Sequence, residues 1–144
     1  MKNLSATIKI AISLSCLLAG CAELAQNGLG KTEYESKCAS CHGVTGKGDG
    51  PQSLVLPKKP ANLTMLTKKN DGIFPAAHVH EVIDGRYEVT AHGPRTMPIW
   101  GREFELDMPD LPKKDAATFH DRETTVRNKI QALVEYLIYL QDNQ

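Results

Sequence analysis

Five consecutive residues carry the strongest chemical pattern in the chain, Cys38-Ala39-Ser40-Cys41-His42. Cysteines at positions i and i+3 of a helix lie on one face, so their sulfur atoms can meet two carbons along one edge of a bound ring. This spacing, with a histidine directly after it, is the pattern for covalent attachment of haem. The imidazole of His42 is then the nearest nitrogen that can reach the iron. We predict that Cys38 and Cys41 hold one haem c and that His42 ligates its iron.

Other uses of the two cysteines explain less of the pattern. A structural zinc site needs a second pair of ligands at similar spacing. The remaining histidines form no such pair; they are His78, His80, His92 and His120. A redox dithiol of the thioredoxin type expects a strand before the pair, and a disulfide at this spacing closes a very small loop. Neither of these two alternatives has a role for His42.

The N-terminus reads as an export signal. Lys2 and Lys9 precede an apolar run over residues 10–19, which is too short to span a bilayer but is typical of a signal peptide. The sequence Leu18-Ala19-Gly20-Cys21 resembles the lipobox of bacterial lipoproteins. The resemblance implies cleavage before Cys21 and a lipid on its sulfur; the alternative is an ordinary signal peptidase cut that leaves Cys21 as a free thiol.

Length and charge suit one small exported domain. We expect residues 1–20 to be the removed signal, residues 21–30 a flexible tether and residues 31–144 the folded domain. The 17 basic and 17 acidic side chains balance, which speaks against nucleic-acid binding. Loss of Lys2 and Lys9 with the signal leaves 15 basic against 17 acidic side chains, a formal charge of about −2.

A glycine-rich segment, residues 43–51, follows the cysteine motif and ends in proline. It must turn tightly, with its backbone close to a neighbouring surface. The segment resembles the loop of small class I cytochromes c, in which a proline carbonyl accepts a hydrogen bond from the outer nitrogen of the ligand histidine. By that resemblance Pro51 is the candidate, and the contact would fix the imidazole tautomer. The alternative is a plain flexible turn.

A second axial ligand is expected from the segment Gly93-Pro94-Arg95-Thr96-Met97-Pro98-Ile99-Trp100-Gly101. Its prolines and glycines stiffen a loop around Met97, and it resembles the Met-Pro element of cytochromes c. His92, five residues upstream, is the rival ligand and would give a lower reduction potential. We interpret Met65 as a packing residue, while Met108 lies in a polar, proline-rich stretch.

Two neighbours of Met97 invite roles through the same resemblance. Trp100 would pack on the edge of the haem ring or reach a propionate, and Arg95 would pair with a propionate. The alternatives are a core tryptophan and a solvated arginine.

The secondary structure read from the sequence is all-α. We expect a helix over residues 32–39, with Thr32 and Glu35 as a capping box and the haem motif at its end. A short helix over residues 76–84 should end at Gly85 and leave His78 and His80 at the surface. Residues 103–122 show no clear period and are expected to form a long surface loop.

A long amphipathic helix is predicted over residues 123–141. It resembles the C-terminal helix of class I cytochromes c, which crosses the N-terminal helix, and Tyr136 stands where that family places an aromatic residue at the crossing. The resemblance implies a small domain of a few helices and long loops wrapped around one haem.

These features predict an electron-transfer protein, because a haem iron with two protein ligands has no vacant site for substrate. We expect it to be an electron carrier, lipid-anchored through Cys21 on the periplasmic or extracytoplasmic face of a bacterial membrane. Its partners would be redox proteins, with no nucleic acid. Catalysis or gas sensing at a labile sixth position is the second hypothesis. The third is a subunit of a larger respiratory complex, with the loop at residues 103–122 as its docking surface.

Overall fold

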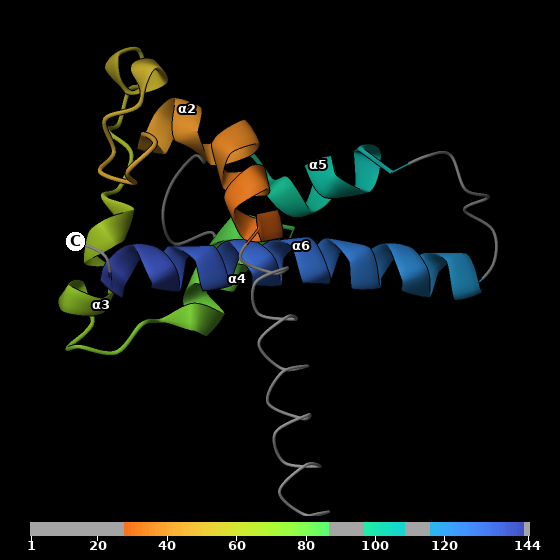
Figure 1. Cartoon of the computed structure of the whole chain (residues 1–144). Helices are drawn as coiled ribbons and strands as arrows, with labels where there is room; N and C mark the ends of the chain where they lie inside the picture. The colour runs from red at the N-terminus through yellow and green to blue at the C-terminus, as the bar shows by residue number, and fades with distance from the viewer. Residues whose placement is uncertain (1–27, 87–96, 109–115, 143–144) are drawn as a thin grey trace, which may run out of the picture.

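The computed structural model describes residues 28–86, 97–108 and 116–142 (Figure 1). Throughout these three ranges the regular structure is helical and no strand occurs, which confirms the all-α class. The elements are a π-helix η1 (Tyr34–Cys38), α2 (Ala39–His42), the 3-10 helices η2 (Pro51–Leu54) and η3 (Leu63–Met65), α3 (Leu66–Lys69), α4 (Ala76–Asp84), α5 (Trp100–Leu106) and α6 (Ala116–Asp142). The expected signal and lipid attachment site lie outside the described residues.

The N-terminal helix starts earlier than predicted. Residues 28–33 are already helical and lead without a break through η1 into α2. The Thr32 hydroxyl donates to the carbonyl of Gly28 inside the helix (2.9 Å) and Glu35 pairs with Lys31 (3.8 Å), so the predicted capping box is wrong. The tether expected at residues 21–30 must also be shortened, because residues 28–30 belong to this helix.

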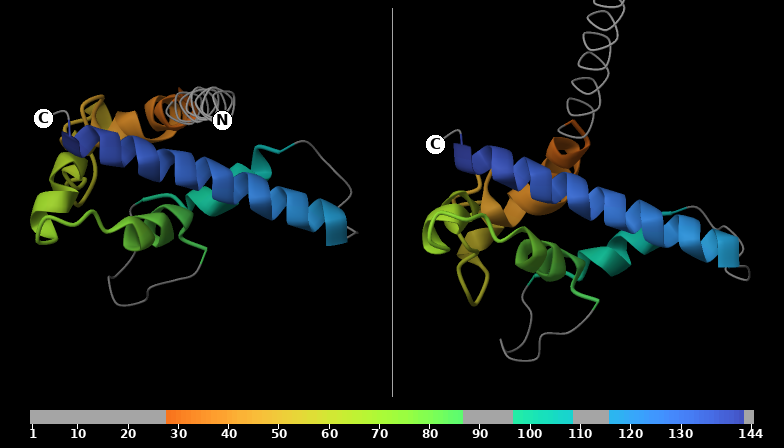
Figure 2. Two further views of the ribbon diagram at one scale, coloured as in Figure 1. Left: turned by 60° about the horizontal axis from the view of Figure 1, so that its bottom comes forward. Right: turned by 90° about the horizontal axis from the view of Figure 1, so that it is seen from below.

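Helix α6 runs along the length of the domain, and the N-terminal helix crosses it (Figures 1 and 2). Gly30 makes the close approach possible, because a β-carbon there would collide with the carbonyl oxygen of Ala132. The rings of Tyr34 and Tyr136 pack at 5.2 Å beside this contact. The predicted crossing, with Tyr136 at it, is therefore confirmed.

Residues 103–122 do not form one long loop, and this prediction is wrong. The residues up to Leu106 belong to α5, and α6 begins at Ala116, seven residues before the predicted start. Helix α5 shows no period in the sequence because Phe104 is its one fully buried side chain, while Gly101 lets it lie close to its neighbours. Residues 109–115 lie outside the described part of the chain.

Helix α4 has the predicted bounds and ends at Gly85, whose φ of 64° is the left-handed conformation of a helix C-cap. His78 is exposed and His80 is partly exposed, as expected. Helices α4, α5 and α6 and the N-terminal helix share one core, formed by Tyr34, Val79, Ile83, Phe104, Val126, Ile130, Leu133, Val134, Tyr136, Leu137 and Leu140. In the described ranges, none of the helices has both the length and the apolar character that crossing a bilayer requires.

Candidate functional site

The end of the N-terminal helix carries the haem motif, residues 38–42. Cys38 is the last residue of the π-helix, in which the N–H of Ala39 donates to the carbonyl of Tyr34 five residues earlier. Such wide turns often occur at functional sites. Cys38 and Cys41 are both free thiols, and both line one cavity of about 320 Å³ together with His42. The helix thus presents the two sulfur atoms and the imidazole to a common space.

A second cavity of about 240 Å³ adjoins the first, and the two share Cys38, His42, Ala61 and Met97 in their walls. The second cavity is lined mainly by apolar side chains of the core; among them are Leu63, Leu66, Val79, Ile83, Leu133 and Leu137. A haem is large, mostly apolar and flat, and needs thiols at one edge and a nitrogen donor at its iron. The residues around the two cavities fit this group.

The ring of His42 is oriented by a backbone carbonyl. Its Nδ1 lies 3.0 Å from the carbonyl oxygen of Ala61, which leaves Nε2 as the nitrogen available to a metal. Burial lowers the pKa of His42, and the hydrogen bond to Ala61 opposes this shift. The imidazole is therefore neutral at pH 7, which is the form that binds iron.

The carbonyl that accepts the hydrogen bond from His42 Nδ1 belongs to Ala61 and not to Pro51, so the contact expected for Pro51 is wrong. The glycine-rich segment folds back onto the helix end, where Gly48 N–H donates to the carbonyl of His42 (2.8 Å) and Gly50 N–H to that of Cys41 (3.1 Å). Pro51 then begins η2 with an exposed side chain. The chain returns to the imidazole ten residues later, at Ala61.

Two glycines make this tight turn possible. A β-carbon at Gly50 would lie 2.5 Å from the carbonyl oxygen of Ser40 and 2.6 Å from that of Ala39. Gly48 has a φ of +77°, and a β-carbon there would meet the carbonyl oxygen of Pro60. The loop therefore holds the haem-motif helix on one side and the segment that carries Ala61 on the other.

Met97 and Trp100 come to the same site from the start of α5. Met97 is half-buried and lines both cavities, and no other methionine of the described residues does so. Trp100 lines the first cavity. Met65 and Met108 line neither cavity. His92 and Arg95 lie outside the described residues. The structure thus brings Met97 to the space that Cys38, Cys41 and His42 share.

Several wall residues had no signal in the sequence. Ala61 acts through its carbonyl, which any residue possesses, and the residue type of Lys58 and Lys59 does not distinguish them from lysines elsewhere in the chain. His78 also lines the second cavity from α4, although its side chain is largely exposed.

Burial raises the pKa of Cys38 to about 12, with Glu33 and Cys41 adding to the shift. An unattached Cys38 is therefore a neutral thiol at pH 7.

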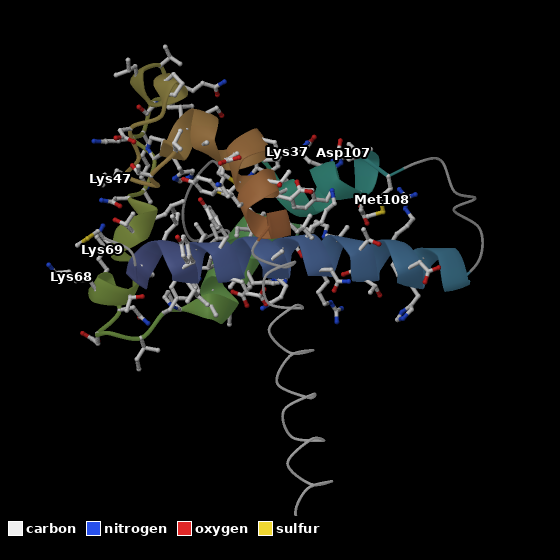
Figure 3. The ribbon with its side chains drawn as sticks, viewed as in Figure 1. Lys37, Lys47, Lys68, Lys69, Asp107 and Met108 are labelled. Atoms are coloured by element: carbon white, nitrogen blue, oxygen red, sulfur yellow. The ribbon has the colours of Figure 1, made fainter. Side chains whose placement is uncertain are left out.

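Ion pairs tie the haem-motif helix to α5 and α6. Lys37 Nζ lies 2.7 Å from Asp107 Oδ2, and Figure 3 shows the two side chains pointing toward each other. Lys129 Nζ lies 2.8 Å from Glu33 Oε1 and also sits over the ring of Phe104 at 5.0 Å. The element that follows Met97 is thereby held against the element that carries the two cysteines.

Comparison with known proteins gives one match. The model of a family described as cytochrome C oxidase, cbb3-type, subunit III, matches residues 25–113, which is more than half of the chain. No curated protein and no solved structure matches the chain. The matched range contains the haem motif, the glycine-rich loop, α4, Met97 and α5, while the whole of α6 lies beyond it.

Proposed function

Because the chain belongs to the family of cytochrome c oxidase, cbb3-type, subunit III, which is a family of c-type cytochromes, we propose that it is an electron carrier with one haem c. Cys38 and Cys41 hold the haem covalently, and His42 and Met97 ligate its iron. The observation that carries this proposal is the pair of adjoining cavities, into which the two thiols, the imidazole and the thioether all open.

A bound haem would supply an iron that gains and loses one electron. The protein residues hold and shield it. The carbonyl of Ala61 fixes the tautomer of His42, and apolar side chains of α4 and α6 line the second cavity, where they would shield a bound haem. A sulfur ligand from Met97 would raise the reduction potential relative to a second histidine. With His42 and Met97 both ligating a bound iron, the chain would leave no site for a substrate, and the protein would only exchange electrons.

The location is the second part of the proposal. Residues 1–20 serve as the export signal, and Cys21 carries the lipid that anchors the mature chain on the periplasmic or extracytoplasmic face of a bacterial membrane. The family description names an oxidase subunit. We therefore infer redox proteins of membrane oxidase complexes as donor and acceptor in a respiratory pathway. The alternative is that the chain is itself a subunit of such a complex.

Haem attachment is tested with the full chain produced in a bacterial host that attaches haem c. Pyridine haemochrome analysis and intact mass should show one covalent haem per chain, and the double variant Cys38→Ala, Cys41→Ala should retain none. Absence of covalent haem from the unaltered protein would refute the proposed function at its base.

The sixth ligand is tested by absorbance of the oxidised protein near 695 nm, a band that marks methionine ligation in cytochromes c. The Met97→Ala variant should lose the band and bind carbon monoxide when reduced, while the control Met65→Ala should keep the band. Survival of the band in Met97→Ala rules Met97 out. Ready binding of carbon monoxide by the unaltered protein would indicate an open sixth position and favour gas binding or catalysis.

The anchor is tested by the mass of the membrane form. We expect the mature chain to begin at Cys21 with the added mass of its lipid, and a Cys21→Ser variant to appear in the soluble fraction. A mature chain without lipid would leave the electron-transfer role intact and refute the anchor alone.

A further inference from the structure

One side chain at the C-terminal end of α6 is bonded to backbone groups far from it in the sequence. Gln141 Nε2 donates to the carbonyl of Leu63 (2.7 Å) and to that of Leu137 (2.9 Å). Its Oε1 accepts from the N–H of Thr67 (3.1 Å), so both amide hydrogens and the oxygen are in use. Gln141 therefore joins the end of α6 to the segment that forms η3 and α3, and the two lie side by side in Figures 1 and 2.

Leu63 is held from its other side as well. Its N–H donates to the carbonyl of Gly46 in the glycine-rich segment (2.7 Å), so the peptide groups on both sides of this residue are bonded. Asn62, directly before it, is fixed through its own side chain, because Asn62 Oδ1 accepts from the N–H of Thr64 (3.0 Å) and from its hydroxyl (2.8 Å). The segment that directly follows Ala61 is therefore anchored to two other parts of the fold.

This anchoring matters because the carbonyl of Ala61 is the group that orients His42, with its oxygen 3.0 Å from Nδ1. Neither Ala61 nor Asn62 belongs to a helix or a strand. The direction of this carbonyl is therefore not set by the hydrogen bonds of a regular element. It is set by the contacts that hold the residues directly after it.

Gln141 itself has no contact with the space for the haem. Leu63 and Leu137, whose carbonyls accept from Gln141, both line the second cavity, but Gln141 lines neither cavity. Any effect of this side chain on the site must therefore pass through the backbone that it holds.

We propose that Gln141 is a positioning residue for His42 and thereby helps to set the reduction potential of the protein. It acts through Leu63, because fixing this residue keeps the Ala61 carbonyl against the imidazole. A hydrogen bond from Nδ1 makes the imidazole a more basic ligand, which favours oxidised iron. Loosening of the segment should therefore raise the reduction potential. This rests on the proposed function, with His42 as a ligand of a bound haem.

The size of the effect is bounded by what one hydrogen bond contributes. Loss of a single hydrogen bond changes an equilibrium constant by about 2-fold to 10-fold. At a given applied potential, Gln141→Leu should shift the ratio of reduced to oxidised protein upward by about this factor, which for one electron is a rise of about 18 to 59 mV. Exchange of the Nδ1 hydrogen of His42 with solvent should become faster by about the same factor.

The test uses the full chain with its haem. The reduction potential is measured by redox titration, and exchange of the His42 Nδ1 hydrogen with deuterium is followed by NMR of the reduced protein. The matched control is Gln131→Leu, the same substitution on the same helix, at an exposed residue whose side chain bonds to Glu135 one turn away. This control should leave the potential and the exchange rate unchanged.

A second variant loosens the same segment from its other end and serves if Gln141→Leu binds haem poorly. Asn62→Ala removes the acceptor for Thr64 and should raise the potential and speed the exchange in the same directions. Its control is Asn70→Ala, because the exposed Asn70 side chain donates to the carbonyl of Ile73 (2.8 Å) and lines neither cavity.

Unchanged potential and exchange in both Gln141→Leu and Asn62→Ala would overturn the proposal even if both proteins are less stable, because Gln141 would then be a purely structural residue. Equal shifts in Gln131→Leu would overturn it too. A lower potential with unchanged exchange would indicate entry of water into the second cavity and would also count against it. Failure of the proposed function looks different, because an unaltered chain without covalent haem has no haem potential to measure.

Discussion

Replacement of Arg86 by leucine tests how the domain holds the element that carries Met97. The Arg86 guanidinium lies at the junction of α4, α5 and α6. It contacts Asp84 Oδ1 at 2.6 Å and Oδ2 at 2.9 Å, and Glu123 Oε2 at 2.7 Å and Oε1 at 3.1 Å. A longer contact of 3.4 Å reaches Glu105 of α5. The substitution keeps an apolar stem and removes all of these charge-assisted hydrogen bonds.

The magnitude follows from the exposure of each carboxylate. Asp84 is 9% exposed, so loss of its partner approaches the case of a broken buried ion pair and costs about 2 kcal/mol. Glu123 is more exposed and contributes about 1 kcal/mol. Glu105, at 36% exposure and 3.4 Å, contributes about zero. We expect the free energy of unfolding to fall by about 3 kcal/mol, a decrease in Tm of about 10 °C for a domain of this size.

Gly101 belongs to the same arrangement. A β-carbon there would lie 2.7 Å from Arg86 Nε and would collide with the carboxylate of Asp84. The first turn of α5, which begins at Trp100, can therefore pack onto the ion pair only because residue 101 has no side chain. Loosening of this contact should also loosen the loop that carries Met97.

The assay is urea unfolding of the haem-loaded protein at pH 7, followed by circular dichroism and by absorbance of the haem. Arg102→Leu is the matched control, because Arg102 is exposed on α5 with no ion pair to the described residues, and it should change the free energy by less than about 0.5 kcal/mol. An Arg86→Leu protein as stable as the unaltered one would refute the assignment of stability to this ion-pair network.

The difference between the two proteins should depend on pH. Hydrogen bonds to Arg86 hold the pKa values of Asp84 and Glu123 below their usual ranges, with smaller effects of His80 on Asp84 and of Arg127 on Glu123. A depressed folded-state pKa stabilises the protein above the unfolded pKa and ceases to do so as the pH falls through the folded value. The stability gap between the unaltered protein and Arg86→Leu should thus be full at pH 7 and shrink below about pH 4.

Substitutions around the haem motif test the local geometry by the yield of haem-loaded protein and by urea unfolding. Gly50→Ala should cost about 3 kcal/mol, because its methyl group would meet the backbone of the motif helix. The control Gly72→Ala has open space and should cost only about 1 kcal/mol, from a φ of +84°. Tyr34→Phe should cost about 1 kcal/mol, since the lost hydroxyl donates to the carbonyl of Gly43 at 2.7 Å. Gln141→Leu should cost about 1 to 2 kcal/mol, because this side chain satisfies backbone groups near η3 from the end of α6.

Local patterns in the sequence were sufficient for several parts of the fold. The spacing of apolar residues identified α4 and most of α6, and Gly85 marked the end of α4, because helix periodicity and C-cap conformation depend on near neighbours. The pattern failed for α5, whose single fully buried side chain, Phe104, produces no period. It failed at Thr32, where a good N-cap residue lies inside a helix that starts earlier.

The sequence alone determined the chemistry of the haem motif, because Cys38, Cys41 and His42 are close in the chain and one helix turn sets their geometry. Only the tertiary structure decided what surrounds them. The carbonyl of Ala61 reaches His42 across 19 residues of chain, and Arg86 meets Glu123 across 37. Such contacts depend on how the loops return and how the helices pack. The residue type of a backbone carbonyl or of a common surface charge does not indicate which distant residue it will contact in the folded chain.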